Sequence, residues 1–183
     1  MKYSWFALHV RSRFEKYVET HLQQKGFDVF CPTYVATRKW SDRTKTISVP
    51  LFPNYVFCRF DLNCRLPILV TPGVNSIVGC GKAPQSVDEQ EIQDIQRITE
   101  AGVTTQPWPF LSVGERVRID SGPLQGLTGI VLREKGHNHL VISVSLLMRS
   151  VSVEIDQYSV QPLSIGSRYP EAALADTAMP GMS

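Results

Sequence analysis

The chain has 183 residues, of which 43% are hydrophobic and 20% are charged, so it can bury a core and is not expected to be disordered as a whole. It has no apolar stretch long enough to cross a bilayer and no signal-peptide layout at its start, so we expect a cytoplasmic protein without a membrane partner. The formal net charge is only +2, but residues 1–60 hold ten Lys and Arg against four Asp and Glu, which predicts a polyanionic partner unless these charges only form a solvated surface.

The first elements in chain order are a strand and a helix. Residues 3–10 are rich in apolar side chains and predict a short buried strand. Ser12 and Glu15 have the spacing of a capping box, in which each residue satisfies a free backbone N–H of the first helical turn. Gly26 supplies a helix stop, so we expect a helix that begins near Ser12 and ends near Gly26.

A basic hairpin is predicted next. Residues 27–35 favour a strand in which Pro32 indicates an edge position or a bulge. Residues 38–46 are polar and basic, and apolar strand character returns at 47–51 and again at 55–60. This order predicts two strands joined by a basic tip and followed by a further strand.

The next elements complete an α+β unit. Residues 74–78 are a strand candidate, and Ser86 with Glu89 forms a second capping-box pattern. A helix then carries isoleucines on one face and ends near Gly102. Helices that follow strands in this order predict a layer of helices packed on a largely antiparallel sheet.

The chain divides into four parts by composition. We assign 1–101 to the α+β domain and 102–112, which contains two prolines, to a short linker. Residues 113–163 show short alternating strands with closely spaced turns, which predicts an all-β SH3-like barrel. Residues 164–183 have no periodicity and are expected to form a disordered tail.

The segment 50–57 is the most informative part of the first domain. In a strand that starts after Asn54, Tyr55 and Phe57 share one face, and Val56 lies on the other. Both faces are largely apolar, so one can face the helices and the other needs a cover or a partner. The residues alone favour the simpler alternative, in which both faces belong to the core.

The segment 117–131 is the most informative part of the second domain. It has alternating apolar residues, a Gly-Pro turn at Gly122, a central Gly126 and a closing glycine at Gly129. This pattern resembles the KOW motif. A purely structural role of the glycines in the barrel would explain the fold without giving a function.

The two halves together resemble the NusG superfamily. The resemblance to its N-terminal (NGN) domain rests on Trp5, the helix start at 12–15, residues 50–57 and 71–74, and the helix over 88–101. The resemblance to its KOW domain rests on 117–131 and on 144–149, and the motifs span about 160 residues in family order. The hairpin segment 40–43 and the segment 51–55 look closer to the specialised antiterminators of the RfaH, UpxY and LoaP type.

The resemblance implies a transcription elongation and antitermination factor that binds RNA polymerase and suppresses pausing. The NGN domain of the family binds the β′ clamp helices through an apolar pocket and reaches toward the β gate loop. By position, the polymerase contact falls on Tyr55 and Phe57, supported by Trp5, Phe52 and Pro53. The KOW domain binds a partner, ribosomal protein S10 or, as the less expected case, Rho, and the matching positions are Leu124, Leu146 and Leu147.

The resemblance also implies a contact with the non-template DNA strand. The matching positions are Arg11, His21, Gln24, Lys25 and Thr71. We also expect the basic hairpin tip to touch upstream DNA, through Arg38, Lys39, Arg43 and Lys45. The chain departs from RfaH at Pro72, where RfaH has an arginine, and at 65–67, which lies near a gate-loop motif that this chain lacks. For each charge, a solvated surface is the alternative.

Two other functions remain open from the sequence. One is a housekeeping NusG that supports Rho-dependent termination, against which the short hairpin argues. The other is a KOW-type module that binds the ribosome or RNA, against which the neutral C-terminal half argues, because phosphate contacts need Lys or Arg.

We do not expect an enzyme, a metal or a cofactor. The cysteines are scattered without a CxxC pair, and the histidines form no nucleophile or metal pattern. A pair of histidines at His137 and His139 has too few ligands for a metal site and is more typical of a loop. The β-branched strands of the second domain give no reason to expect refolding into helices, and nothing in the linker demands a masked pocket.

Overall fold

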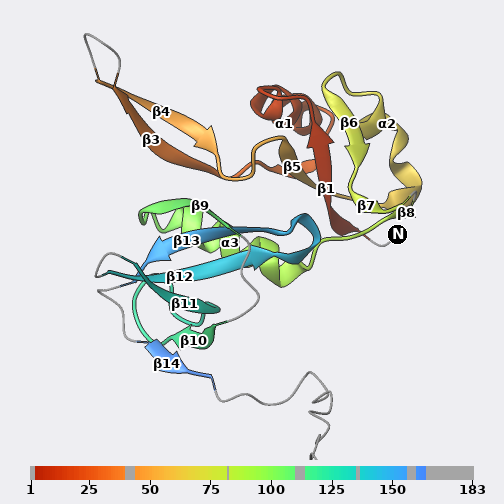
Figure 1. Ribbon diagram of the computed structural model, residues 1–183. Helices are drawn as coiled ribbons and strands as arrows, with labels where there is room; N and C mark the ends of the chain where they lie inside the picture. Colours follow the sequence, from red (N-terminus) through yellow and green to blue (C-terminus); the bar gives the residue numbers. More distant parts are fainter. Residues whose placement is uncertain are drawn as a thin grey trace, which may run out of the picture.

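The computed structural model describes residues 3–39, 44–81, 83–109, 114–134, 137–155 and 160–163 (Figure 1). The tail expected to be disordered, 164–183, lies outside the described residues. Within the described part, no helix has the length and apolar character needed to cross a membrane. The fold class is the expected one, an α+β sheet with packed helices followed by an all-β unit.

The first sheet has four antiparallel strands in the order β2-β5-β1-β6. Its strands are β1 (Ser4–Val10), β2 (Asp28–Phe30), β5 (Tyr55–Phe60) and β6 (Val74–Ile77). Around them lie α1 (Glu15–Gln24), η1 (Leu62–Cys64), α2 (Leu66–Leu69), the pair β7 (Gly79–Cys80) and β8 (Ala83–Pro84), and α3 (Glu89–Glu100). Helix α1 covers one face of the sheet, where Val18 and Leu22 pack with Leu8 and Val56 in a fully buried cluster.

Helix α1 ends as predicted but begins differently. Gly26 has φ +85° and accepts the left-handed conformation, and the backbone N–H of Phe27 donates to the carbonyl of Leu22 at 3.1 Å. At the other end, no side chain caps the helix, which starts at Glu15. The predicted capping box fails because the Glu15 carboxylate accepts a hydrogen bond from the backbone N–H of Asn54, at 2.9 Å, instead of one from its own helix.

The second predicted capping box is also wrong, because the residue that caps α3 lies two positions after the predicted Ser86. The side chain of Asp88 caps α3 by accepting a hydrogen bond from the backbone N–H of Gln90 at 2.7 Å. Glu89 instead forms an ion pair with Arg59 of β5, at 3.2 Å. The isoleucine face is as expected, because the three isoleucines of α3 are fully buried: Ile92, Ile95 and Ile98.

A long two-stranded hairpin extends away from the first sheet (Figure 1). It consists of β3 (Thr33–Lys39) and β4 (Thr44–Pro50). The single strand predicted over 27–35 is in fact two strands in different sheets, because the chain leaves β2 at Cys31 and Pro32 before β3 begins. The hairpin tip lies outside the described residues, as do the side chains predicted to touch upstream DNA: Arg38, Lys39, Arg43 and Lys45.

The second sheet has six antiparallel strands in the order β14-β10-β11-β12-β13-β9. They are β9 (Thr105–Pro109), β10 (Glu115–Ile119), β11 (Thr128–Glu134), β12 (His137–Val144), β13 (Arg149–Glu154) and β14 (Val160–Pro162), with η2 (Ser145–Leu147) between β12 and β13. Strand β9 falls within the segment assigned to a linker, and pairs with β13 through Trp108 opposite Ser150. Its two prolines fit this place, since β9 is an edge strand.

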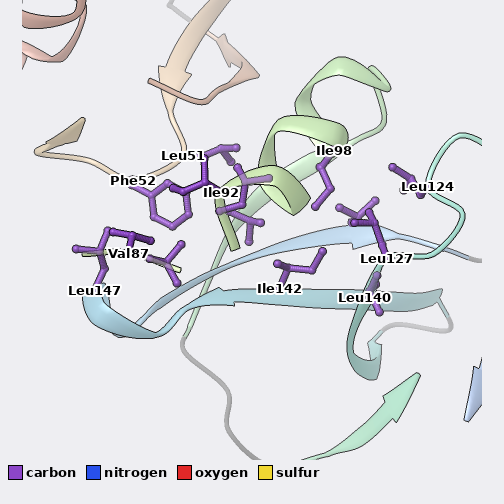
Figure 2. Packing of buried hydrophobic residues seen from close by; sticks show 14 of the residues in the cluster. Leu51, Phe52, Val87, Ile92, Ile98, Leu124, Leu127, Leu140, Ile142 and Leu147 are labelled. Atoms are coloured by element: carbon purple, nitrogen blue, oxygen red, sulfur yellow. The ribbon is translucent and has the colours of Figure 1, made fainter. Parts of the chain in front are cut away.

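The two sheets share one hydrophobic core, a relation that the sequence left undetermined. Helix α3 lies against β12, with Ile98 beside Leu124 and Leu127 and with Ile92 near Phe52 (Figure 2). The described chain therefore forms a closed arrangement, in which the second sheet packs on α3 and on the face of the first sheet that α1 leaves uncovered.

The cysteines should divide into two reactivity classes. Burial raises the pKa of the Cys31 and Cys58 thiols to about 12, so neither forms appreciable thiolate at pH 8, whereas Cys64 and Cys80 are exposed. Titration of the native protein with a chromogenic disulfide at pH 8 should show two fast thiols, and all four should react in denaturant. Fast reaction of all four in the native protein would contradict the burial described here.

Gly73 and Gly26 offer a matched pair of substitutions. Both have positive φ, but a Cβ at Gly73 would lie 2.7 Å from Cδ1 of Phe14, whereas a Cβ at Gly26 would meet open space. Each alanine should cost roughly 1 kcal/mol for its backbone conformation. Gly73→Ala should lose clearly more stability in urea unfolding than Gly26→Ala, and equal losses would show that the contact with Phe14 is unimportant.

Candidate functional site

The face of the first sheet opposite α1 carries the residues predicted to bind RNA polymerase. Tyr55 and Phe57 of β5 point to this face together with Trp5 of β1, and Phe57 lies opposite Ala7 in the strand register. Phe52 packs edge-on against Phe57, with ring centroids 5.5 Å apart. Phe52 and Phe57 are at most 1% exposed, and Tyr55 is half-buried. The structure therefore brings these aromatic side chains together, whereas Pro53 stays exposed at the margin.

The second sheet covers this aromatic face. Leu147 lies beside Val87 and near Phe52 (Figure 2). The guanidinium of Arg149, at the start of β13, lies 5.2 Å from the centre of the Tyr55 ring, which is the geometry of a cation–π contact. The second apolar face of the strand that contains 55–57 was predicted to need a cover or a partner. In this structure the second sheet of the same chain covers it.

The residues predicted to bind a partner of the KOW domain lie in the same cluster. Leu124 is fully buried, Leu147 is 9% exposed, and Leu146 is half-buried against them. Leu124 faces Ile98 of α3 (Figure 2). In this arrangement both predicted binding surfaces therefore lie within one shared hydrophobic core.

Polar contacts from α3 flank the apolar interface. The Glu91 carboxylate accepts a hydrogen bond from the backbone N–H of Ser145 at 3.1 Å, and the guanidinium of Arg97 donates to the carbonyl of Gln125. Burial raises the pKa of Asp94 above its usual value, although Gln90 donates a hydrogen bond to its carboxylate at 2.8 Å. No local pattern of residues predicts the contacts of Glu91, Arg97 or Arg149, because their partners lie far away along the chain.

The residues predicted to contact DNA gather on the outer side of α1. Nζ of Lys25 donates to the carbonyl of Pro67 at 2.9 Å and to Oγ1 of Thr71 at 2.7 Å. Thr71 is 2% exposed, so in this structure it orients Lys25 instead of facing solvent. Gln24 and Arg11 are exposed and His21 is half-buried. Helix α1 lies on the side of the first sheet away from the second sheet (Figure 1).

A cavity of about 220 Å³ lies near the base of the hairpin. Its lining includes Glu15 and Lys16, whose polar groups already have partners. Glu15 accepts from Asn54, and Lys16 is bound to Glu19 at 2.6 Å, a hydrogen bond that raises the pKa of Lys16. Among the described residues, no three His, Cys, Asp or Glu side chains are grouped to hold a metal, and His137 pairs with Glu154 at 3.0 Å.

Comparison with known proteins identifies a family and several similar proteins. Residues 3–96 match the family model described as "Transcription termination factor nusG". Similar proteins named "Transcription termination/antitermination protein NusG" include one from Rickettsia felis, 26% identical over 165 residues that cover 83% of this chain and 86% of the relative. Others come from Helicobacter pylori strain J99 (28% identical; 82% and 93% covered) and Staphylococcus aureus strain Mu50 (27% identical; 87% and 95% covered).

A solved structure titled "Domain interaction in Thermotoga maritima NusG" is 21% identical, has a TM-score of 0.49, and covers 85% of this chain and 94% of that chain. The family model spans just over half of the residues and includes the whole aromatic face. The chain therefore belongs to the NusG family of transcription termination and antitermination factors, and it is not an enzyme.

Proposed function

We propose that the chain is an elongation and antitermination factor of the specialised type, which binds the β′ clamp helices of RNA polymerase and suppresses pausing. The observation that carries this proposal is the aromatic face of β5 and β1, formed by Trp5, Phe52, Tyr55 and Phe57. A helix pair of the polymerase would dock through a few apolar anchors of this kind. No bond is made or broken, and the factor acts by favouring one polymerase conformation over another.

The closed arrangement adds a condition to this mechanism. The clamp helices and the second sheet compete for the same aromatic face, so the polymerase binds only molecules in which the two have separated. The apparent dissociation constant is then the intrinsic one divided by the open fraction. Opening frees Leu124, Leu146 and Leu147 at the same time, so the ribosomal partner would be recruited by molecules that already engage the polymerase.

The polymerase contact gives the first functional prediction. Tyr55→Ala should remove an anchor without emptying the core, because Tyr55 is only half-buried, and should weaken polymerase binding by tenfold or more. Loss of the contact with Arg149 also favours opening, but a cation–π pair at an exposed site contributes only about 0.5–1 kcal/mol. Dwell times at a defined pause, measured with matched RNA polymerase, should shorten with the wild type and lengthen again with Tyr55→Ala.

The matched control is Tyr3→Ala, which makes the same substitution at a tyrosine that is 57% exposed and outside the aromatic face. It should retain full pause suppression. Equal activity of both variants would remove the aromatic face from the mechanism, while a wild type that affects no pause would reject the proposed function.

The competition between polymerase and second sheet gives a gain-of-function prediction. Leu147→Glu places a carboxylate in the shared core next to Val87 and should shift molecules toward the open state. Binding to RNA polymerase, measured by fluorescence anisotropy, should become several-fold tighter than for the wild type. Met148→Glu changes the adjacent residue, which is 63% exposed, and should bind like the wild type. Weaker or unchanged binding of Leu147→Glu would contradict the masking.

A housekeeping factor that supports Rho-dependent termination is the second candidate, and the names of the relatives include termination as well as antitermination. Binding of purified Rho to the wild-type chain in complex with RNA polymerase would favour this candidate. Binding of ribosomal protein S10 without Rho would favour the antiterminator.

A further inference from the structure

The turn that precedes β5 positions the first anchors of the aromatic face. The backbone N–H of Tyr55 donates to the carbonyl of Phe52 at 3.0 Å, which closes a turn over residues 52–55. Within this turn Asn54 has φ +71°, a left-handed conformation that residues other than glycine rarely adopt. Further contacts must therefore hold Asn54 in place, because the direction in which β5 starts depends on its backbone.

Both backbone polar groups of Asn54 are bound by neighbouring elements. Its carbonyl accepts a hydrogen bond from the backbone N–H of Val10, the last residue of β1, at 2.8 Å. Its own N–H donates to Oε1 of Glu15 at 2.9 Å. Glu15 is the first residue of α1, the helix that covers the opposite face of the first sheet. One carboxylate therefore joins this helix to the strand end that carries the aromatic residues of the other face.

The surroundings of Glu15 make it a fixed acceptor. The residue is 6% exposed, and its place in the first turn of α1 lets the positive end of the helix dipole stabilise its charge. A hydrogen bond to a carboxylate is stronger than one to a neutral acceptor, and its removal leaves the N–H of Asn54 without this partner. Glu19, one turn later, is buried to a similar degree but binds Lys16 of the same helix. Glu15 thus links two elements, whereas Glu19 acts within one.

We propose that Glu15 is a positioning residue for RNA polymerase binding, because it holds the turn that presents Phe52 and Tyr55 to the clamp helices. This inference rests on the proposed function and adds to it a residue of α1. The turn is bonded before the polymerase arrives, so binding does not have to order it. The carboxylate acts mainly through Tyr55, whose half-buried ring lies beside the His9 ring with centroids 5.6 Å apart. Without the bond Asn54 can return to negative φ, which turns the Tyr55 ring away from this place.

The test measures the dissociation constant between RNA polymerase and the full chain, by fluorescence anisotropy, for the wild type and a matched set of variants. Glu15→Met keeps the length of the side chain but replaces the carboxylate by a thioether, which is only a weak acceptor. Glu15→Gln keeps an acceptor oxygen at the same place. Glu19→Met is the control, since it makes the same change at the carboxylate that binds within α1.

Two further variants complete the set. Glu15→Met is combined with Tyr55→Ala and compared with Tyr55→Ala alone, which shows whether the carboxylate acts through that ring. Glu15→Asp keeps the charge but is one methylene shorter, so it tests the same bond if Glu15→Met does not fold. Thermal unfolding of each variant shows that it is folded.

Glu15→Met and Glu15→Asp should bind the polymerase about tenfold more weakly than the wild type, while Glu15→Gln and Glu19→Met stay within about twofold. In the Tyr55→Ala background, Glu15→Met should cause at most about a twofold further loss.

Four results would overturn the positioning role and leave the polymerase proposal intact. They are binding of Glu15→Met equal to the wild type, an equal loss with Glu19→Met, a full additional loss in the Tyr55→Ala background, and tighter binding of Glu15→Met. Tighter binding is the result expected if the substitution only loosens the cover by the second sheet. A wild type that does not bind the polymerase would overturn the polymerase proposal itself and the positioning role with it.

Discussion

A strand that is apolar on both faces has to be covered twice, and β5 imposes this constraint on the rest of the molecule. Val56 and Phe60 direct one face toward α1, and that face is sealed by the helix. The face that carries Phe57 points away from α1, and α3 is the part of the first domain that packs near it. The six-stranded sheet completes this cover. The residues of the first domain therefore require a cover on this face, and the second sheet supplies it.

This constraint separates the two surfaces that we assign to function. The aromatic face is buried by the second sheet, whereas the outer side of α1 stays exposed on the opposite side of the first sheet (Figure 1). In the closed molecule a partner can therefore reach the outer side of α1 but not the aromatic face. Because α3 contacts both sheets, their separation breaks the shared core and the polar contacts that flank it. A ligand opens the molecule only if it binds the open state more tightly by a free energy that exceeds the stabilisation from these contacts.

Local patterns of the sequence were reliable where the interaction they describe is local. Gly26 ends α1 through its own backbone conformation, and the isoleucine spacing of α3 marks its buried face. The capping boxes failed because distant groups competed for the same side chains. Glu15 is taken by Asn54, and Glu89 by Arg59.

The candidate site shows the same division between local and distant interactions. The alternation of Tyr55 and Phe57 predicted a shared face in need of a cover, but nothing in those residues identifies Leu147 or Arg149 as the cover. Contacts such as that between Tyr55 and Arg149, which are more than ninety positions apart, depend on the path of the whole chain. The i, i+4 spacing of Tyr17 and His21 was visible in the sequence, yet their stacking depends on rotamers that the spacing leaves open.

The pairing of β9 with β13 determines how far the two domains can separate. While β9 stays in the second sheet, only residues 101–104 connect it to α3, and their extended reach is roughly 15 Å. If β9 dissociates from β13, the connection between α3 and the second sheet lengthens to residues 101–114, whose extended length is about 50 Å. Dissociation of strand β9 therefore makes the linker between the two domains longer. Renewed pairing of its five strand residues with β13 would bring the second sheet back to short range of α3.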